Sequence, residues 1–300
     1  MRPFDGDARG AGPIKDAEKT VFFMCRLLPG LPDSLGQLTA LTSLEIDSCY
    51  AFTGLPESLG QLAALTELKI GVCSTLTGLP ESLGQLSALT SLTLRECNAM
   101  TAIPETLGQL LSLTTFEVQS CHALTALPES LGQLTALKIL SVTKNVILTR
   151  LPESLGHLAA LTKLNLTQSY ALTELPTSLG RLAALGDLNI TMCHTLSGLP
   201  GLPPHLQLLT MYQCEGITRL SVACAEIPCI ATEYSNLAVL LRRQYYWPQV
   251  LVLVIAGRRV CPLLLTHQRF VLPFNLHSFL LKFQISSTIH LILINIVFRF

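Results

Sequence analysis

Cysteine is the residue type whose spacing in this chain could carry chemistry. Seven of the ten cysteines fall in one column of a repeating pattern, and asparagine and serine fill the two places where the column lacks cysteine. The column consists of Cys25, Cys49, Cys73, Cys97, Cys121, Asn145, Ser169, Cys193 and Cys214. A structural metal site needs ligands that converge tetrahedrally on one ion. One thiol per repeat instead predicts a buried ladder that contacts backbone groups of the bend after each strand.

The other polar motifs do not assemble into a catalytic or metal-binding set. Four histidines lie in different phases of the repeat: His122, His157, His194 and His205. The sequence has no HExxH, GxSxG or CxxC pattern and no paired-carboxylate pattern. Two N-glycosylation sequons begin at Asn165 and Asn189, but residues 1–20 do not resemble a secretory signal, so we interpret both as chance matches. We expect no enzyme activity, no cofactor and no metal.

A leucine or isoleucine followed by proline recurs every 24 residues. The pairs begin at Leu31, Leu55, Leu79, Ile103, Leu127, Leu151, Leu175 and Leu199. Each unit reads LPESLGQLxALxxLxIxxCxxLTx and is too short to bury its own apolar face. The units must therefore stack on one another as a solenoid.

The pattern inside a unit predicts which elements position these columns. Apolar pairs such as Leu44 and Ile46 alternate with polar residues, which predicts one half-buried strand per repeat and eight strands from Leu44 to Met211. Strands one repeat apart should pair in parallel at roughly 4.8 Å. The stretch PESLGQL should return along the convex side, with Ser58 capping a short helical turn and with Leu59 and Leu62 in the core.

The periodic region sets the domain boundaries. Residues 1–20 form a polar leader, expected to be disordered, and residues 21–220 form the solenoid, whose last unit is shortened. Phe22, Cys25 and Leu28 indicate a degenerate half-repeat at its start. Residues 221–300 form a basic, apolar and poorly defined tail.

The segment Leu38-x-x-Leu41-x-x-Leu44-x-Ile46-x-x-Cys49 fits the leucine-rich-repeat pattern LxxLxLxxC. With the following xxLTxLPESLGxL, it resembles the repeat domains of plant disease-resistance receptors and of plant intracellular Ras-group leucine-rich-repeat proteins. The resemblance implies an α/β solenoid, a horseshoe with a parallel concave sheet and short helical or irregular convex turns. It also implies a cytoplasmic protein-binding domain in signalling or defence. The chain lacks the GxxxxGK[ST] loop of the receptors' nucleotide-binding domain, so only the binding module is expected.

The outward-facing strand positions differ between repeats, whereas LPESLGQL barely changes. We predict that these positions bind a protein on the concave face. The predicted residues are Glu45, Asp47, Glu67, Lys69, Arg95, Glu96, Glu117, Gln119, Lys144, Lys163, Asn165, Gln168, Asp187, Asn189 and Tyr212. The alternative is that polar strand positions facing water drift freely. Their mixed charge argues against nucleic acid as the partner.

The tail differs from the rest of the chain in charge. The chain has 20 basic and 20 acidic residues, yet every acid lies at or before Glu233, so residues 234–300 carry a net charge of +7. Residues 277–298 could act as a membrane anchor, which would make the chain a fragment of a membrane-anchored receptor or adaptor. Alternatively, the tail caps the last repeat, or it is not a selected folded sequence. We expect the solenoid itself to be cytoplasmic.

Overall fold

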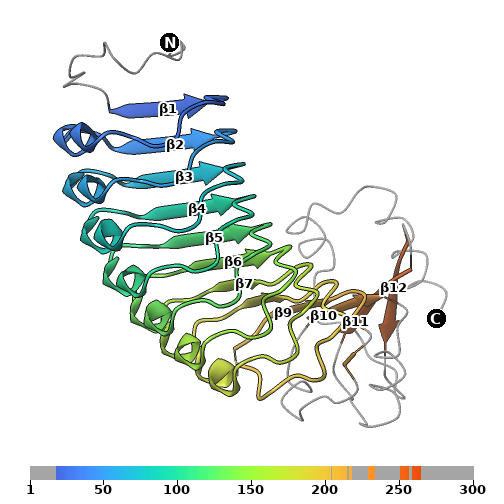
Figure 1. Ribbon diagram of the computed structural model, residues 1–300. Helices are drawn as coiled ribbons and strands as arrows, with labels where there is room; N and C mark the ends of the chain where they lie inside the picture. The colour runs from blue at the N-terminus through green and yellow to red at the C-terminus, as the bar shows by residue number, and fades with distance from the viewer. Residues whose placement is uncertain are drawn as a thin grey trace.

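The fold is a stack of parallel strands that form one sheet, seen in a computed structural model (Figure 1). The structure describes residues 18–203, 205–214 and 216–217 and the backbone of three later strands. The strands of the stack are β1 (Lys19–Phe23), β2 (Ser43–Asp47), β3 (Glu67–Gly71), β4 (Ser91–Arg95), β5 (Thr115–Gln119), β6 (Ile139–Thr143), β7 (Lys163–Asn165), β8 (Asp187–Asn189) and β9 (Leu208–Met211). The eight strands predicted from Leu44 to Met211 are β2 to β9, and that prediction is confirmed.

The register of the sheet follows the repeat of the sequence. Leu44 pairs with Leu68, and Leu68 pairs with Leu92, so equivalent residues of successive repeats lie side by side. The degenerate half-repeat forms β1, which begins at Lys19 and pairs in parallel with β2. The side chains of Leu44, Phe116 and Leu188 are fully buried in one continuous core. Stacking therefore gives each repeat the apolar cover that it cannot provide for itself.

Short 3-10 turns return the chain along the outer side of the curved stack (Figure 1). They are η1 (Asp33–Gln37), η2 (Glu57–Gln61), η3 (Glu81–Gln85), η4 (Glu105–Gln109), η5 (Glu129–Gln133), η6 (Glu153–His157) and η7 (Thr177–Arg181). The predicted burial of Leu59 and Leu62 is confirmed, because both side chains are 0% exposed.

The predicted cap of these turns is wrong. Pro56 occupies the N-cap of η2 with extended backbone, so Ser58 lies within the turn. The Ser58 hydroxyl has no hydrogen-bond partner. Instead, a carboxylate of one repeat accepts the backbone N–H of the next turn: Ser82 N donates to Glu57 Oε2 at 3.0 Å. The acidic residue of the motif therefore links neighbouring repeats, and the serine does not cap its own turn.

The sheet continues into the region predicted to be the tail. β10 (Cys229–Glu233) pairs in parallel with β9, β11 (Leu251–Ala256) pairs in parallel with β10, and β12 (Arg259–Leu264) pairs antiparallel with β11. Residues 277–298 and the leader residues 1–17 lie outside the described residues, so the predictions made for them stay predictions. In the part of the chain that the structure describes, no helix is long and apolar enough to cross a bilayer.

Candidate protein-interaction face

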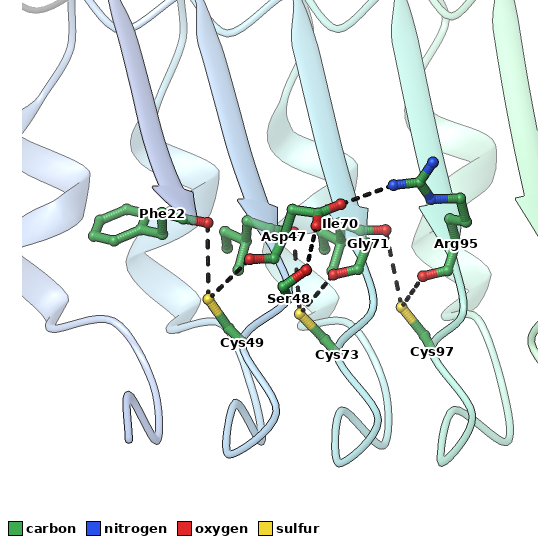
Figure 2. Close-up of polar contacts among 10 residues, drawn as sticks. Phe22, Asp47, Ser48, Cys49, Ile70, Gly71, Cys73, Arg95 and Cys97 are labelled. Carbon is green, nitrogen blue, oxygen red and sulfur yellow. Dashed lines mark hydrogen bonds and ion pairs between the residues drawn. The ribbon is translucent and has the colours of Figure 1, made fainter. Parts of the chain in front are cut away.

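The side chains of the ladder column contact the backbone of the bend after each strand, as predicted (Figure 2). The Cys73 thiol lies 3.3 Å from the carbonyl oxygen of Gly71 and 4.0 Å from that of Ile46 in the preceding repeat. At Asn145 an amide replaces the thiol and makes three hydrogen bonds. Its Nδ2 donates to Val118 O and Thr143 O, and its Oδ1 accepts from Cys121 N. The ladder is therefore a structural feature that links repeats through polar backbone groups.

Burial makes the thiols of Cys73 and Cys193 poor nucleophiles and poor metal ligands. Desolvation raises the pKa of the Cys73 thiol to about 12 and that of the Cys193 thiol to about 12. A thiol binds metal and attacks electrophiles as the thiolate, which these groups do not form near pH 7. Cys25 at the start of the stack differs because it is only half-buried. Among the described residues, no group of three side chains is placed to hold a metal ion.

The residue before each ladder position adopts a left-handed backbone conformation, which the sequence analysis missed. This column consists of Met24, Ser48, Val72, Glu96, Ser120, Lys144, Gln168, Met192 and Gln213, with φ between 50° and 61°. Its N–H groups continue the strand ladder: Val72 N, for example, donates to Arg95 O at 2.8 Å. Glycine or asparagine usually signals such a position, and neither occurs in this column. Three predicted face residues, Glu96, Lys144 and Gln168, therefore project from the edge of the sheet.

Several predicted face residues form ion pairs with one another. Arg95 Nη2 lies 2.9 Å from Asp47 Oδ2, although β3 runs between their strands (Figure 2). The pair forms across Gly71 of β3, because a Cβ at that position would collide with Asp47 Oδ2. Because Gly71 has no side chain, two repeats that are not neighbours in the stack can form an ion pair.

Two further ion pairs join predicted residues. Lys69 Nζ lies 2.6 Å from Glu67 Oε1, and Lys163 Nζ lies 3.2 Å from Asp187 Oδ2. The hydrogen bond from Lys69 lowers the pKa of the Glu67 carboxyl below its ordinary value. Exposed pairs of this kind contribute about 0–1 kcal/mol each, so they order the surface more than they stabilise the fold.

The remaining predicted residues have different surroundings. Glu45 pairs with Lys19 of β1 at 3.6 Å, and Gln168 donates to the Met192 sulfur at 3.4 Å. Each of the two sequon asparagines accepts a 2.6 Å hydrogen bond from the threonine two residues later. Tyr212 follows β9 and is half-buried. Of the predicted face residues, four make no side-chain hydrogen bond or ion pair within the described part of the chain: Glu96, Glu117, Gln119 and Lys144.

The structure also reveals apolar side chains beside the face that the sequence analysis did not select. Val146, Ile147 and Tyr170 follow the ladder positions of two successive repeats, and all three are exposed. The Tyr170 ring stacks on the ring of His194, with centroids 5.7 Å apart and an interplanar angle of 2°. The sequence signal for these side chains lies in the column one residue after the ladder, which reads Tyr50, Ser74, Asn98, His122, Val146, Tyr170 and His194.

Comparisons with known proteins agree with this architecture. Residues 81–200 match the family model of the leucine-rich repeat region. Among solved structures, the chain is similar to the leucine-rich repeat domain of the type III effector XCV3220 (XopL), with 27% identity, a TM-score of 0.63 and coverage of 70% of this chain and 73% of that one. No curated protein matches the sequence.

Two more distant structures also align with the chain. A leucine-rich repeat protein of Leptospira interrogans, LIC12759, has 20% identity and a TM-score of 0.45, with 77% of this chain and 66% of that chain covered. The plant peptide hormone receptor RGFR1, solved in complex with RGF2, has 17% identity and a TM-score of 0.41, with 80% and 49% covered. The stack of parallel strands and the 3-10 turns give the described part of this chain the fold of a leucine-rich-repeat solenoid.

Proposed function

We propose that this chain is a non-catalytic scaffold that binds another protein on the concave sheet. The leucine-rich-repeat fold is typically non-catalytic and suggests a protein-interaction scaffold. One observation carries the assignment to the sheet: its outward side chains change from repeat to repeat, whereas the buried and turn positions are repeated almost unchanged. A long sheet with a changing surface offers many contact points to one partner.

The charge pattern of the sheet favours a partner of mixed charge. Ion pairs hold Asp47 with Arg95 and Glu67 with Lys69, so these side chains are already ordered before binding. Ordered side chains lose less entropy when a partner arrives. Glu96, Glu117 and Lys144 leave charge of both signs available, which disfavours a polyanion such as nucleic acid.

We place this scaffold in cytoplasmic signalling or a plant-type defence response, which is what the resemblance to plant resistance receptors and Ras-group repeat proteins supports. A second candidate is a membrane-anchored receptor or adaptor fragment, favoured by the apolar composition of residues 277–298. Expression with and without residues 234–300, followed by membrane fractionation, distinguishes the two. Equal partition of both forms into the soluble fraction would remove the anchored alternative.

Charge reversal on the sheet tests the binding face. Affinity capture followed by mass spectrometry should recover a protein with the intact chain and lose it with Lys69→Glu/Arg95→Glu. The matched control is Lys138→Glu/Arg181→Glu, which makes the same change in net charge at exposed residues away from the outward strand columns. Circular dichroism should show that both variants remain folded, because exposed charges contribute little stability. Equal capture by both variants would contradict the concave face as the binding surface.

A further inference from the structure

The residue type in the ladder column changes at two adjacent repeats. Asn145 and Ser169 replace cysteine there, and both side chains are fully buried. Asn145 makes three hydrogen bonds to backbone groups, and the Ser169 hydroxyl donates to Val142 O at 3.1 Å. Such bonds are stronger and more directional than the contacts of a thiol, which is only a weak donor. The loops after Asn145 and Ser169 are therefore held firmly in place.

These same two loops expose apolar side chains. Val146 is 38% exposed, Ile147 is 41% exposed and Tyr170 is 37% exposed. Most other repeats carry small or polar residues at the two positions after the ladder, such as Asn98 and Ala99. The exceptions, Leu27 and Tyr50, are also exposed but lie at the start of the stack. We call Val146, Ile147, Tyr170 and His194 the rim strip.

The scaffold does not require isoleucine at this place. The equivalent Thr75 donates its hydroxyl to the carbonyl oxygens of Tyr50 and Phe52, at 2.8 and 3.0 Å. Thr195 donates the same pair of bonds to the carbonyl oxygens of Tyr170 and Leu172 in the preceding repeat. Ile147 cannot form such bonds, and its side chain projects toward solvent. Exposed apolar patches mark interaction sites on protein surfaces, and tyrosine is enriched among the residues that carry most of the binding energy.

The rim strip is continuous across repeats and rigid. Val146, Tyr170 and His194 occupy equivalent positions in three successive repeats, whose strands are spaced at roughly 4.8 Å. Stacking fixes the ring of Tyr170 against that of His194. A straight and rigid strip of this kind suits a ligand that is itself linear, such as an extended peptide.

Basic side chains border the strip. Lys144 precedes the buried Asn145, is exposed, and makes no hydrogen bond or ion pair within the described residues. Arg150 is exposed in the same loop, and Glu174 is the exposed acid at the equivalent place of the next repeat. Positive charge therefore exceeds negative charge beside the strip, which favours a carboxylate on the ligand.

We propose that the rim strip binds an extended peptide segment of a partner protein that carries an aliphatic or aromatic side chain beside a carboxylate. This inference deepens the scaffold function and rests on it. The apolar side chain packs on Val146, Ile147 and Tyr170, and the carboxylate pairs with Lys144.

Selection from a random dodecapeptide library displayed on phage, with the intact chain immobilised, tests the proposal. The selected sequences should share an apolar residue next to Asp or Glu. A fluorescent synthetic peptide of that consensus should bind Val146→Asn/Ile147→Ala about tenfold more weakly than the unchanged chain. This variant reproduces the Asn98-Ala99 pair of another repeat and should therefore fold. The matched control is Leu111→Ala, which removes an exposed apolar side chain far from the strip and should leave the affinity unchanged.

A double-mutant cycle tests the ion pair. Replacing the carboxylate of the peptide by an amide should weaken binding to the unchanged chain by several-fold, and the difference should vanish with Lys144→Met. Overturning results are a selection without enrichment, a consensus that lacks the apolar-acidic pair, or equal affinity for Val146→Asn/Ile147→Ala. Such a failure leaves the scaffold proposal standing, because that proposal is tested by capture with Lys69→Glu/Arg95→Glu. Loss of both would reject the scaffold function itself.

Discussion

The turns on the convex side and the outward face of the sheet belong to the same repeats, but they differ in how much their sequence changes. In the turns, Gly108 packs so closely on the next repeat that a Cβ would lie 2.6 Å from Ser130 O. Glu105 accepts the backbone N–H of Ser130 at 2.9 Å. On the sheet, the equivalent outward positions carry Glu117, Ser141 and other unrelated residues. Residues that contact the next repeat are therefore the same in most repeats, whereas residues exposed to solvent or to a partner differ between repeats.

The two faces of one strand should show the largest contrast. Phe116→Ala removes a fully buried ring from the core and should lower the free energy of unfolding by about 3–5 kcal/mol. Glu117→Ala changes the next residue, which faces outward, and should stay within about 0.5 kcal/mol. Urea denaturation of both variants measures the contrast. Similar losses would mean that the outward face also carries the stability of the solenoid.

Glycine substitutions sharpen the comparison on the convex side. Gly108→Ala should lower the free energy of unfolding by about 1–3 kcal/mol, because the new methyl group meets the backbone of Ser130. Gly78→Ala is the control, since the nearest atom to its Cβ, Ala102 O, is 4.0 Å away. Thermal unfolding of the pair should show a lower midpoint for Gly108→Ala alone. A tolerated Gly108→Ala would show that neighbouring turns can separate at little cost.

The left-handed column lies between the two regions, and Val72 is its β-branched member. Val72→Gly should raise the free energy of unfolding by up to about 1 kcal/mol, because glycine adopts a φ of 50° without steric cost. Thr93→Gly in the middle of β4 should lower the free energy of unfolding. Glycine raises the conformational entropy of the unfolded chain there and relieves no backbone strain in the folded one. Destabilisation by both substitutions would indicate that apolar contacts of Val72 outweigh its backbone strain.

The smallest effect should come from the exposed carboxylates of the turns, and it depends on pH. Hydrogen bonds from the backbone N–H of Thr177 and then Ser178 lower the pKa of the Glu153 carboxyl. Its stabilising contribution is therefore present above the ordinary glutamate pKa of about 4.3 and is lost as the pH falls through the lowered value.

The stability difference between the unchanged chain and Glu153→Gln should accordingly shrink as the pH falls below the ordinary glutamate pKa of about 4.3. Glu81→Gln serves as the control, because Glu81 makes no such hydrogen bond within the described residues. Urea midpoints measured across this pH range check the prediction. A difference that grows toward low pH would contradict the assigned role of the carboxylate.

The register of the solenoid could be predicted from sequence because all repeats before the shortened last one have the same length of 24 residues. The phase of Leu44 and Ile46 was enough to place β2 and its neighbours, and the ladder column followed from the same count. The cap at Ser58 was predicted wrongly, because a local motif cannot show that an acid in the adjacent repeat supplies the acceptor. A contact between two repeats cannot be recognised from the sequence of either repeat alone.

The candidate face was harder to predict than the fold. Sequence comparison of repeats found Asp47 and Arg95 as outward residues, but their ion pair spans 48 residues and depends on the missing side chain of Gly71. The rim strip depends on which residues stay exposed after Asn145 and Ser169 bend the chain, and exposure was not evident from the column alone. Whether the predicted residues bind a partner stays a prediction.

The carboxylate bridge that joins four of the turns to the next turn has a consequence for how such an array can lengthen. Glu57, Glu105, Glu129 and Glu153 each accept a hydrogen bond from the same backbone N–H of the following unit, so four junctions are chemically alike. A duplicated unit of 24 residues would meet partners on both sides that already suit it. Growth by whole units therefore requires no new joint, and the span of the sheet can increase one strand at a time without a change in its chemistry.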